Sequence, residues 1–448
     1  TDRQESHAHQ EHGGERLSAM ASALNGGGNG GGGLLKVSLL RFQYYCVLGA
    51  VAGAVIFATL RYMPAAAGSG GAGPLSTTSA VGTAAAPSAA RAVEHRKSKG
   101  MVVAAKVKPA EVLVFNFGDS NSDTGGAVAI MGIPIASPEG RAFFHHPTGR
   151  LSDGRVVLDF ICETLNTHHL SPYMKPLGSD YSNGVNFAIA GATATPGDTP
   201  FSLDVQVDQF VFFRDRCNDS IIRGEPAPVD PKDFHKALFT MDIGQNDITS
   251  IMYLPYDQVL AKLPHFVAEI RRAIQTLHKN GARKFWIHGT GALGCLPAKL
   301  AIPKDNDGGL DEHGCIIKFN DAAKKFNQLL SEACDDLRWQ LKKSAVIFVD
   351  MFAIKYDLVA NHTKYGIEKP LMTCCGHGGP PYNYDPKKSC MGVDKDTCKP
   401  DEKLISWDGV HFTDAANSLV ASMAIGGEYS IPRMKLTSLV KPAKSNDS

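Results

Sequence analysis

The chain has 448 residues, and 46 Lys and Arg balance 45 Asp and Glu to leave a net charge of +1. That length suffices for one large domain or two ordinary ones. The near-neutral balance provides no strong basic field, so nucleic acid is not expected as a partner. Ten cysteines are present. All but one lie beyond residue 160, which suits an oxidising compartment, although reduced thiols in a cytosolic enzyme would give the same count.

The N-terminal part of the chain is predicted to tether the rest to a membrane. Residues 1–41 are polar and then Gly-rich, which predicts a disordered cytoplasmic tail. Residues 42–60 are uncharged and mostly apolar, and about 20 such residues span a bilayer. A cleaved signal peptide and a buried core helix are the rival interpretations. The Ala-, Gly-, Ser- and Pro-rich residues 61–109 predict a flexible stem. The basic residues before the span favour a cytoplasmic N-terminus.

Strands and helices alternate through residues 110–432, and a flexible tail is predicted at 433–448. The predicted strands are residues 112–115, 185–188, 238–243, 284–288 and 345–349. The predicted helices are residues 158–165, 256–280, 315–341 and 413–425. Pro264 either kinks the second helix or marks its first turn. The alternation predicts a central parallel sheet of about five strands with helices on both faces, an α/β fold with its site at the carboxyl ends of the strands.

Four motifs fall at predicted strand ends or just before a helix. In chain order they are GDSNSDTG from Gly118, NFAIAGATAT from Asn186, DIGQND from Asp242 and DGVHFTDAAN from Asp408. Together they indicate acyl transfer. The Ser120 hydroxyl becomes nucleophilic when a neutral imidazole removes its proton. His411 is the candidate base, and Asp408, three residues earlier, is placed to hold its other ring nitrogen.

The same reaction needs hydrogen-bond donors for the oxyanion of the tetrahedral intermediate. The backbone N–H groups of Ser120 and Gly191 and the side-chain amide of Asn246 are the candidates. Losing one such donor typically raises the barrier by about 3 kcal/mol. Each motif alone is weak, because a lone Ser after Asp is more often a helix cap and a lone histidine is more often a surface or core residue. The presence of all four motifs in this order favours catalysis.

These motifs resemble those of the plant GDSL esterase/lipase family, a branch of the SGNH hydrolases. The matching residues are Gly118-Asp119-Ser120, Gly191, Gly244-Gln245-Asn246-Asp247 and the Asp408-x-x-His411 pair, spread over residues 111–430. The resemblance implies a three-layer α/β/α fold, a Ser–His–Asp ester hydrolase site, no metal and no cofactor. The last block continues with Thr-Asp instead of Thr-Glu. The Gly-x-Ser-x-Gly motif of the α/β-hydrolase fold is absent around Ser120.

A group of cysteines near the end of the domain has two interpretations. Cys374, Cys375, Cys390 and Cys398 with His377 contain enough ligands for zinc. Adjacent cysteines are poor joint ligands, however, and the Pro- and Gly-rich loop favours disulfides. Cys295 and Cys315 bracket another loop and are also expected to pair, although connectivity does not follow from sequence.

The substrate and location are predicted from the tether. Glycosylation acceptors begin at Asn218, Asn361 and Asn446. A span with a stem resembles Golgi-anchored family members that deacetylate xylan or its arabinosyl side chains. We therefore expect a type II Golgi membrane protein, anchored through residues 42–60, that deacetylates a polysaccharide. The alternatives are a secreted location, a lipid or small-molecule ester hydrolase, a catalytically silent glycan-binding protein and an acyltransferase.

Four tyrosines could offer surfaces on which sugars stack. They are Tyr253, Tyr256, Tyr382 and Tyr384. Packing in the core or within a loop is the commoner role for such residues.

Overall fold

The computed structural model describes residues 112–132, 136–196, 200–302, 308–388, 390 and 395–440. The predicted tail, membrane span and stem at residues 1–109 lie outside this part of the chain. Among the described residues, no helix has both the length and the apolar character needed to cross a membrane. The transmembrane span therefore stays a prediction from sequence.

A six-stranded sheet in the order β2-β1-β3-β4-β5-β8 forms the centre of the fold. Its strands are β1 (Val114–Gly118), β2 (Gly184–Asn186), β3 (Leu238–Asp242), β4 (Lys284–His288), β5 (Ala345–Val349) and β8 (Ser430–Ile431). The first five are parallel, as predicted, and β8 pairs antiparallel with β5 at one edge. β1 and β3 are buried along their whole length, as expected of strands covered on both faces.

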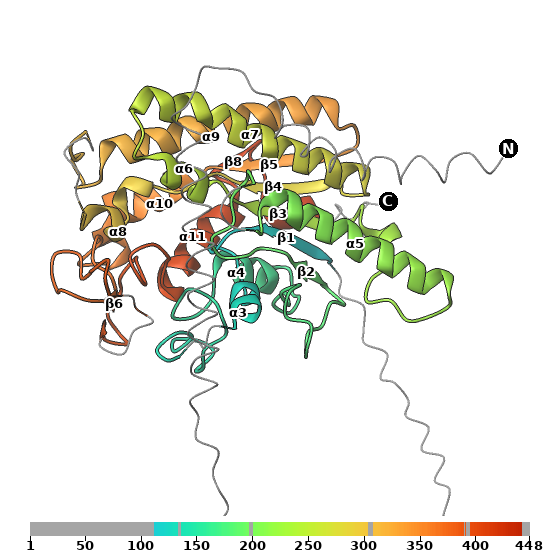
Figure 1. Ribbon diagram of the computed structural model, residues 1–448, viewed down its shortest axis with the longest axis horizontal. Coiled ribbons are helices and arrows are strands. Elements are labelled where there is room, and N and C mark those ends of the chain that lie inside the picture. The colour runs from blue at the N-terminus through green and yellow to red at the C-terminus, as the bar shows by residue number, and fades with distance from the viewer. Residues whose placement is uncertain are drawn as a thin grey trace, which may run out of the picture. The chain divides into compact units, whose positions relative to one another are not determined.

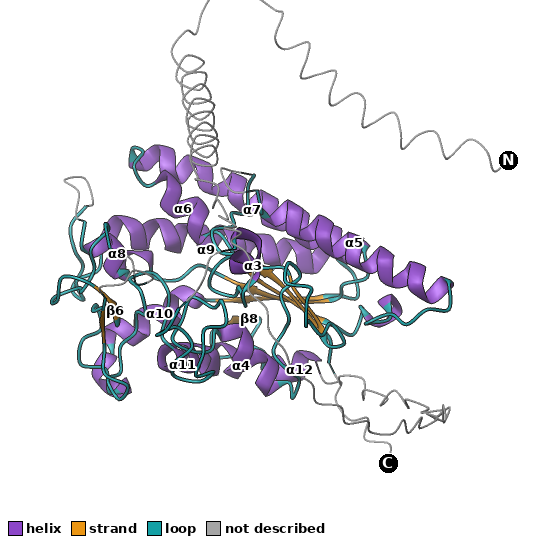
Figure 2. Cartoon of the chain, turned by 60° about the horizontal axis from the view of Figure 1, so that its bottom comes forward, coloured by secondary structure: helices purple, strands orange, loops and turns teal. Residues whose placement is uncertain are grey.

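Helices cover both faces of the sheet, which gives the three layers of an α/β/α fold (Figures 1 and 2). One layer contains α5 (Leu203–Ile222), α7 (Tyr256–Lys279) and α9 (Ile317–Gln340), and α7 packs against the other two. The other layer contains α4 (Val157–Thr164), α10 (Met351–Ala360), α11 (Asp414–Gly426) and α12 (Leu436–Val440), with α11 in contact with the other three. Short helices α3 (Gly126–Met131), α6 (Gln245–Ile251) and α8 (Pro297–Leu300) follow strand ends or connecting loops.

Two sequence expectations differ from the structure. Pro264 lies well inside α7, so it does not mark the first turn of that helix. Within the predicted flexible tail at 433–448, residues 436–440 form α12, whose Leu436 is fully buried. An apolar residue that is removed from water in this way offsets the entropy of ordering a short terminal helix.

Three disulfides join Cys295 to Cys315, Cys374 to Cys398 and Cys375 to Cys390. The expected pairing of the cysteine-rich loop is therefore confirmed. The loop also contains a small second sheet of β6 (Cys375–Gly376) and β7 (Asp396–Thr397). In the part of the chain that the structure describes, no cluster of His, Cys, Asp and Glu is suited to hold a metal ion.

The predicted glycosylation acceptors lie in different surroundings. Asn361 is exposed directly after α10, whereas Asn218 lies within α5 and is half-buried. Asn446 lies outside the described residues. Glycosylation stays a prediction.

Candidate active site

The end of β1 places Ser120 at the carboxyl edge of the sheet. Gly118 has φ of 151°, and a Cβ atom there would lie 2.3 Å from the Asp242 carbonyl oxygen on β3. Only glycine permits this close turn out of the strand. Gln206 of α5 fixes the turn, because its amide accepts from the Gly118 N–H and donates to the Gly118 carbonyl, both at 2.8 Å. Ser120 follows in the turn and is 6% exposed.

Asp123 connects the Ser120 turn to the loop that contains Gly191. One carboxylate oxygen of Asp123 accepts from the N–H groups of Gly125 at 2.8 Å and Gly126 at 2.6 Å. The other accepts from Ala127 at 3.0 Å and from Ala190 at 2.8 Å. The last bond fixes the residue directly before Gly191, which has φ of 83°. A backbone-bound carboxylate of this kind holds two loops in one geometry.

Asn186, at the end of β2, makes a second connection between the same two segments. Its amide donates to the Ser122 carbonyl at 2.7 Å and to the Thr124 hydroxyl at 2.9 Å. Its oxygen accepts from Asn116 at 2.7 Å and from the Ala188 N–H at 3.0 Å. Asn186 is fully buried, so these bonds satisfy a polar group that would otherwise be costly to bury.

The third motif is attached to the Gly191 loop as well. Asp247 accepts from the N–H groups of Ala194 at 2.7 Å and Thr195 at 3.1 Å. Asn246, half-buried at the start of α6, donates from its amide nitrogen to the Ala192 carbonyl at 2.9 Å. An amide nitrogen carries two hydrogens. One N–H of Asn246 therefore orients the side chain, and the second is chemically available to a substrate oxygen.

His411 and Asp408 form a pair on the segment before α11. His411 Nδ1 lies 2.6 Å from Asp408 Oδ2, and Asp408 Oδ1 accepts from the N–H groups of Val410 at 2.9 Å and His411 at 2.8 Å. Burial opposes the charge of Asp408, but His411 and these hydrogen bonds hold its pKa below the usual value. Burial also disfavours imidazolium, but the charge and hydrogen bond of Asp408 raise the pKa of His411 above its ordinary value. Asp408 is thus ionised and fixes the ring.

The cysteine-rich loop anchors the segment that contains this pair. The N–H groups of Cys374 and Cys375 donate to the carbonyls of Ser406 at 2.9 Å and Trp407 at 2.6 Å. Both cysteines are in disulfides. The crosslinked loop therefore holds Trp407, the residue directly before Asp408, in place.

A group of buried titratable side chains lies below the Ser120 turn. Asp119, next to Ser120, is fully buried, and its Oδ2 has no hydrogen-bond partner. Burial, and then the charge of Asp242, raise the pKa of Asp119 to about 7. Asp242 Oδ2 lies 3.4 Å from His288 Nδ1 across β3 and β4. The positive charge of Lys355, on α10, favours ionisation of both aspartates.

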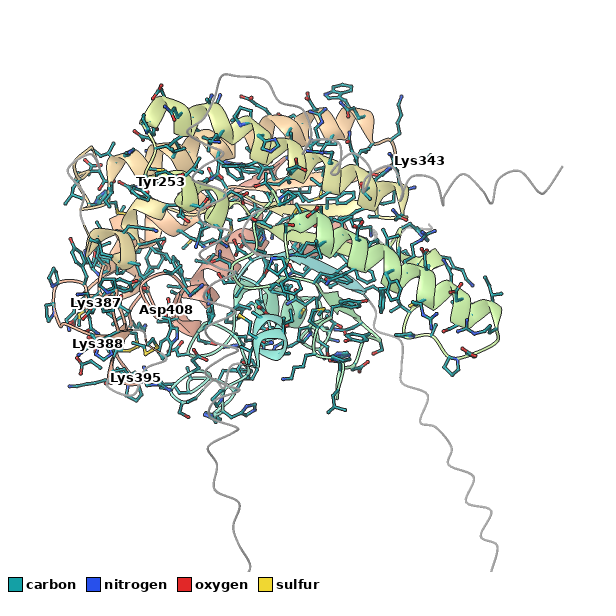
Figure 3. The ribbon with its side chains drawn as sticks, in the orientation of Figure 1. Tyr253, Lys343, Lys387, Lys388, Lys395 and Asp408 are labelled. Atoms are coloured by element: carbon teal, nitrogen blue, oxygen red, sulfur yellow. A yellow bond between two sulfur atoms is a disulfide. The ribbon has the colours of Figure 1, made fainter. Side chains whose placement is uncertain are left out.

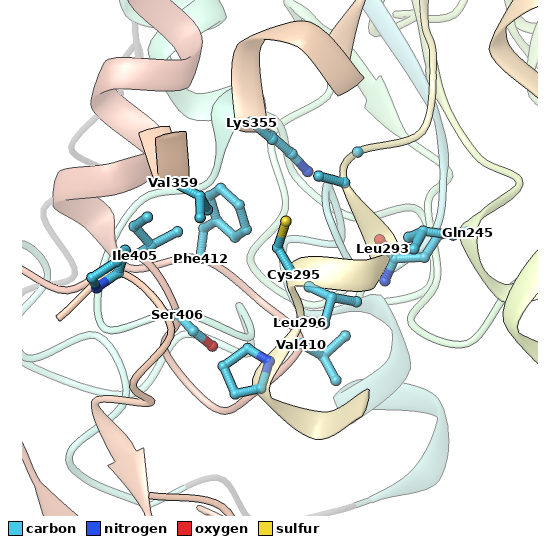
Figure 4. A pocket seen from close by; sticks show the side chains of 14 residues that line it. Gln245, Leu293, Cys295, Leu296, Lys355, Val359, Ile405, Ser406, Val410 and Phe412 are labelled. Atoms are coloured by element: carbon cyan, nitrogen blue, oxygen red, sulfur yellow. The ribbon is translucent and has the colours of Figure 1, made fainter. Parts of the chain in front are cut away.

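Lys355 also lines a small, mostly apolar cavity of about 20 Å³ beside the His411 segment (Figure 4). Val410 and Phe412, the two neighbours of His411, belong to its wall, and the Lys355 ammonium lies 4.8 Å from the centre of the Phe412 ring. A cavity of this size has room for about one water-sized group.

The family model described as GDSL-like Lipase/Acylhydrolase matches residues 114–423. This chain belongs to the GDSL lipase/acylhydrolase family. GDSL esterase/lipase At1g09390 of Arabidopsis thaliana is 47% identical over 326 residues, which are 71% of this chain and 88% of that relative. GDSL esterase/lipase ACHE of Zea mays is 41% identical over 347 residues, 72% of this chain and 87% of that relative. The GDSL chain is accordingly a hydrolase of carboxylic esters.

One solved structure is also similar to this GDSL chain. Axe2, an acetylxylan esterase from Geobacillus stearothermophilus, matches at 15% identity and a TM-score of 0.31, over 71% of this chain and 95% of its own. The family assignment rests on sequence.

Three of the four GDSL motifs are joined by direct hydrogen bonds. Asp123 and Asn186 join the Ser120 turn to the Gly191 loop, and Asn246 and Asp247 join that loop to α6. The fourth motif is connected less directly. Among the hydrogen bonds of the described residues, none joins the Ser120 hydroxyl to His411, although the charge of Asp119 acts on the pKa of His411. Such bonds often tighten only when substrate binds.

Sequence reasoning assigned roles to Ser120, Gly191, Asn246, Asp408 and His411 but missed the residues that position them. Asp123 and Asp247 lie inside the motifs that begin at Gly118 and Asp242. Their positions close to Ser120 and Asn246 could therefore have indicated a positioning role. Gln206 had no such signal, because it lies in a helix that the sequence did not predict.

Proposed function

We propose that this GDSL hydrolase is a serine esterase that removes O-acetyl groups from a cell-wall polysaccharide, xylan or its arabinosyl side chains. The observation that supports it most is the Asp408–His411 pair at 2.6 Å, together with the side chains that connect the Ser120, Gly191 and Asn246 segments. An oriented base and three adjoining candidate donors are what a serine acyl transfer requires.

In the proposed reaction, the Ser120 hydroxyl attacks the acetyl carbonyl and His411 Nε2 takes its proton. Asp408 keeps the proton of the ring on Nδ1 and stabilises the imidazolium that forms. His411 then gives the proton to the departing sugar oxygen, which leaves an acetyl ester on Ser120. Water, deprotonated by the same imidazole, attacks this ester, and His411 returns the proton to the Ser120 oxygen as acetate leaves.

The negative oxygen of each tetrahedral intermediate is placed among three donors. They are the backbone N–H groups of Ser120 and Gly191 and the second amide N–H of Asn246. The contact of Asn246 with the Ala192 carbonyl orients this amide before substrate arrives. Orientation in advance matters because donors that need not reorganise stabilise the transition state most.

The polysaccharide substrate is proposed on two grounds. The predicted span at residues 42–60 and stem at 61–109 are the plan of a lumenal glycan-processing enzyme. In addition, the apolar cavity lined by Val410 and Phe412, the neighbours of His411, has a volume of about 20 Å³ and is far too small for a long acyl chain. The corresponding location is the Golgi membrane, type II, with the hydrolase in the lumen. We expect a glycan on the exposed Asn361 that an endoglycosidase removes. In sealed microsomes, the hydrolase domain should be protected from added protease.

The decisive assay measures acetate released from acetylated xylan by the full-length chain. We expect release by the wild type and a loss of at least about 1,000-fold in Ser120→Ala. Ser122→Ala is the matched control, because Ser122 is a neighbouring buried serine whose hydroxyl accepts a bond from Asn116. It should keep activity in the folded fraction. Equal release by Ser120→Ala would refute the nucleophile.

The alternatives give different outcomes in the same assay. Cleavage of p-nitrophenyl palmitate without acetate release from xylan would identify a lipid esterase. Binding of xylan without hydrolysis of any ester would identify a silent glycan-binding protein. Transfer of acetyl to added sugar, detected by product mass, would identify an acyltransferase.

A further inference from the structure

A large open groove lies beside the segment that contains Asp408 and His411. Its volume is about 520 Å³, within the range of about 300–1,000 Å³ that is common for ligand sites. One wall is formed by Leu300 and Ala301 at the end of α8 and by Leu310. The opposite wall is the loop 378–384. Both walls contain apolar side chains as well as exposed backbone.

The groove is in direct contact with the proposed catalytic turn. Tyr384 lines the groove, and its ring lies against Gly409, where an added Cβ atom would be 2.5 Å from Tyr384 Cδ2. Gly409 lies between Asp408 and His411. Burial and the charge of Asp408 raise the pKa of the Tyr384 phenol. In α8, whose last residue Leu300 lines the groove, the N–H of Ala298 donates to the Gly409 carbonyl at 3.0 Å. The turn is therefore in contact with the groove residue Tyr384 and with the helix that ends at the groove.

The loop wall is held rigidly in place. Disulfides Cys374–Cys398 and Cys375–Cys390 fix its base. Asn383, between the two groove tyrosines, is buried, and its side chain donates to the Thr373 carbonyl and accepts from the Gly379 N–H, both at 3.1 Å. A binding surface that is ordered in advance loses less entropy when a ligand binds.

The chemistry of the walls suits a sugar chain better than an acyl chain. Tyr382 and Tyr384 are half-buried and offer both ring surface and phenolic hydroxyls. Gly378 and Gly379 leave the space beside their Cα atoms open, which widens the groove at this loop. Sugar rings present apolar C–H faces and polar edges, and so match this mixture. A hydrocarbon chain would offer no hydrogen-bond partner to the phenolic hydroxyls.

We propose that this groove is the subsite for the sugar residues that flank the acetylated residue of a polysaccharide. Tyr382 and Leu310 provide the surface on which these sugars pack. The inference rests on the proposed deacetylase function. In this proposal the sugar chain, which is the alcohol part of the ester, binds in the open groove.

The test compares a polymer-like substrate with a small one. Tyr382→Leu keeps an apolar side chain but loses the aromatic face, and Leu310→Ala trims a residue that is 55% exposed and so leaves the core intact. For acetylated xylo-oligosaccharides we expect KM to rise about ten-fold in each variant, as the loss of one packing contact between a sugar ring and an apolar side chain would cause. The kcat/KM for p-nitrophenyl acetate should stay the same, because that ester does not reach the groove.

Tyr253→Leu is the matched control. Tyr253 is 74% exposed and does not line the groove, and Figure 3 shows it well away from Asp408. Tyr253→Leu should change neither the KM for acetylated xylo-oligosaccharides nor the kcat/KM for p-nitrophenyl acetate. Calorimetry with deacetylated xylo-oligosaccharide and Ser120→Ala provides a readout independent of catalysis, and Leu310→Ala in that background should weaken binding.

The outcomes separate the two proposals. Wild-type deacetylation with unchanged KM in Tyr382→Leu and Leu310→Ala would overturn the groove and leave the proposed function standing. A wild type that cleaves p-nitrophenyl acetate but no acetylated glycan would overturn the polysaccharide substrate and, with it, the sugar occupant of the groove.

Discussion

Asp119 offers a sharp test of the electrostatics at the nucleophile turn. It is fully buried beside Ser120, its Oδ2 has no hydrogen-bond partner, and burial and Asp242 raise its pKa to about 7 from 3.8. A carboxyl group whose pKa is raised by folding destabilises the folded state once it must ionise. The isosteric change Asp119→Asn removes this titration and keeps an oxygen to accept from Asn121.

The magnitude follows from proton linkage. Below pH 3.8 the group is protonated in both states, so it has no effect. Between pH 3.8 and about 7 the unfolded chain releases a proton that the folded chain retains, so folding stability falls as pH rises. Above pH 7 the full cost of about 4 kcal/mol is present, since each unit of pKa shift is worth 1.36 kcal/mol. Asp119→Asn should therefore gain about 4 kcal/mol relative to wild type between pH 4 and pH 8.

Urea unfolding of both proteins at pH 4, 6 and 8 measures this difference directly. Comparing the difference between the two proteins across pH cancels any steric cost of the amide. A stability difference that is the same at all three pH values would show that Asp119 has an ordinary pKa, and the picture of an isolated buried carboxyl would be wrong.

Three further changes test other parts of the structure. Burial opposes the charge of Asp159, but the two bonds from Arg150 at 2.7 and 2.8 Å lower the pKa of Asp159. Asp159→Asn should therefore lower the free energy of unfolding by about 3–5 kcal/mol at pH 7. The loss should shrink as pH falls through the pKa that Asp159 has in the folded protein. Because Asp408 raises the pKa of His411 above its ordinary value of 6.5, the fall of kcat/KM on acidification should begin above pH 6.5. A profile that is flat from pH 5 to 8 would exclude His411 as the base. Replacing both Cys375 and Cys390 by serine should lower the free energy of unfolding by about 3 kcal/mol. Thermal unfolding measures this loss, and an unchanged Tm would contradict it.

The sequence was most informative where burial repeats a simple pattern. The strands at residues 284–288 and 345–349 agree with β4 and β5 to the residue, because each is a short apolar run between turn-forming segments. Helix α5 was missed because its buried face includes a polar side chain, Gln206, which pairs with the backbone of Gly118. Strand β8 has two residues, too few for any periodic signal. Both depend on tertiary contacts that a local pattern does not contain.

The candidate site shows the same division between chemistry and support. The reactive groups were readable because acyl transfer restricts their residue types and their order along the chain. Their support was not, because a carboxylate such as Asp123 or Asp247 can bind backbone N–H groups in any loop.

The two halves of the site are also held by different means. Buried polar side chains join Ser120 to the donors at Gly191 and Asn246. Disulfide-linked backbone instead supports the segment of Asp408 and His411. No hydrogen bond joins the described side chains of Ser120 and His411, so their alignment depends on the support of each segment and on indirect links such as the bond from the Asp414 N–H to Asp153. Two of the three described disulfides lie in the loop whose backbone supports Asp408, so reducing them should loosen the segment of the base and not the turn of the nucleophile.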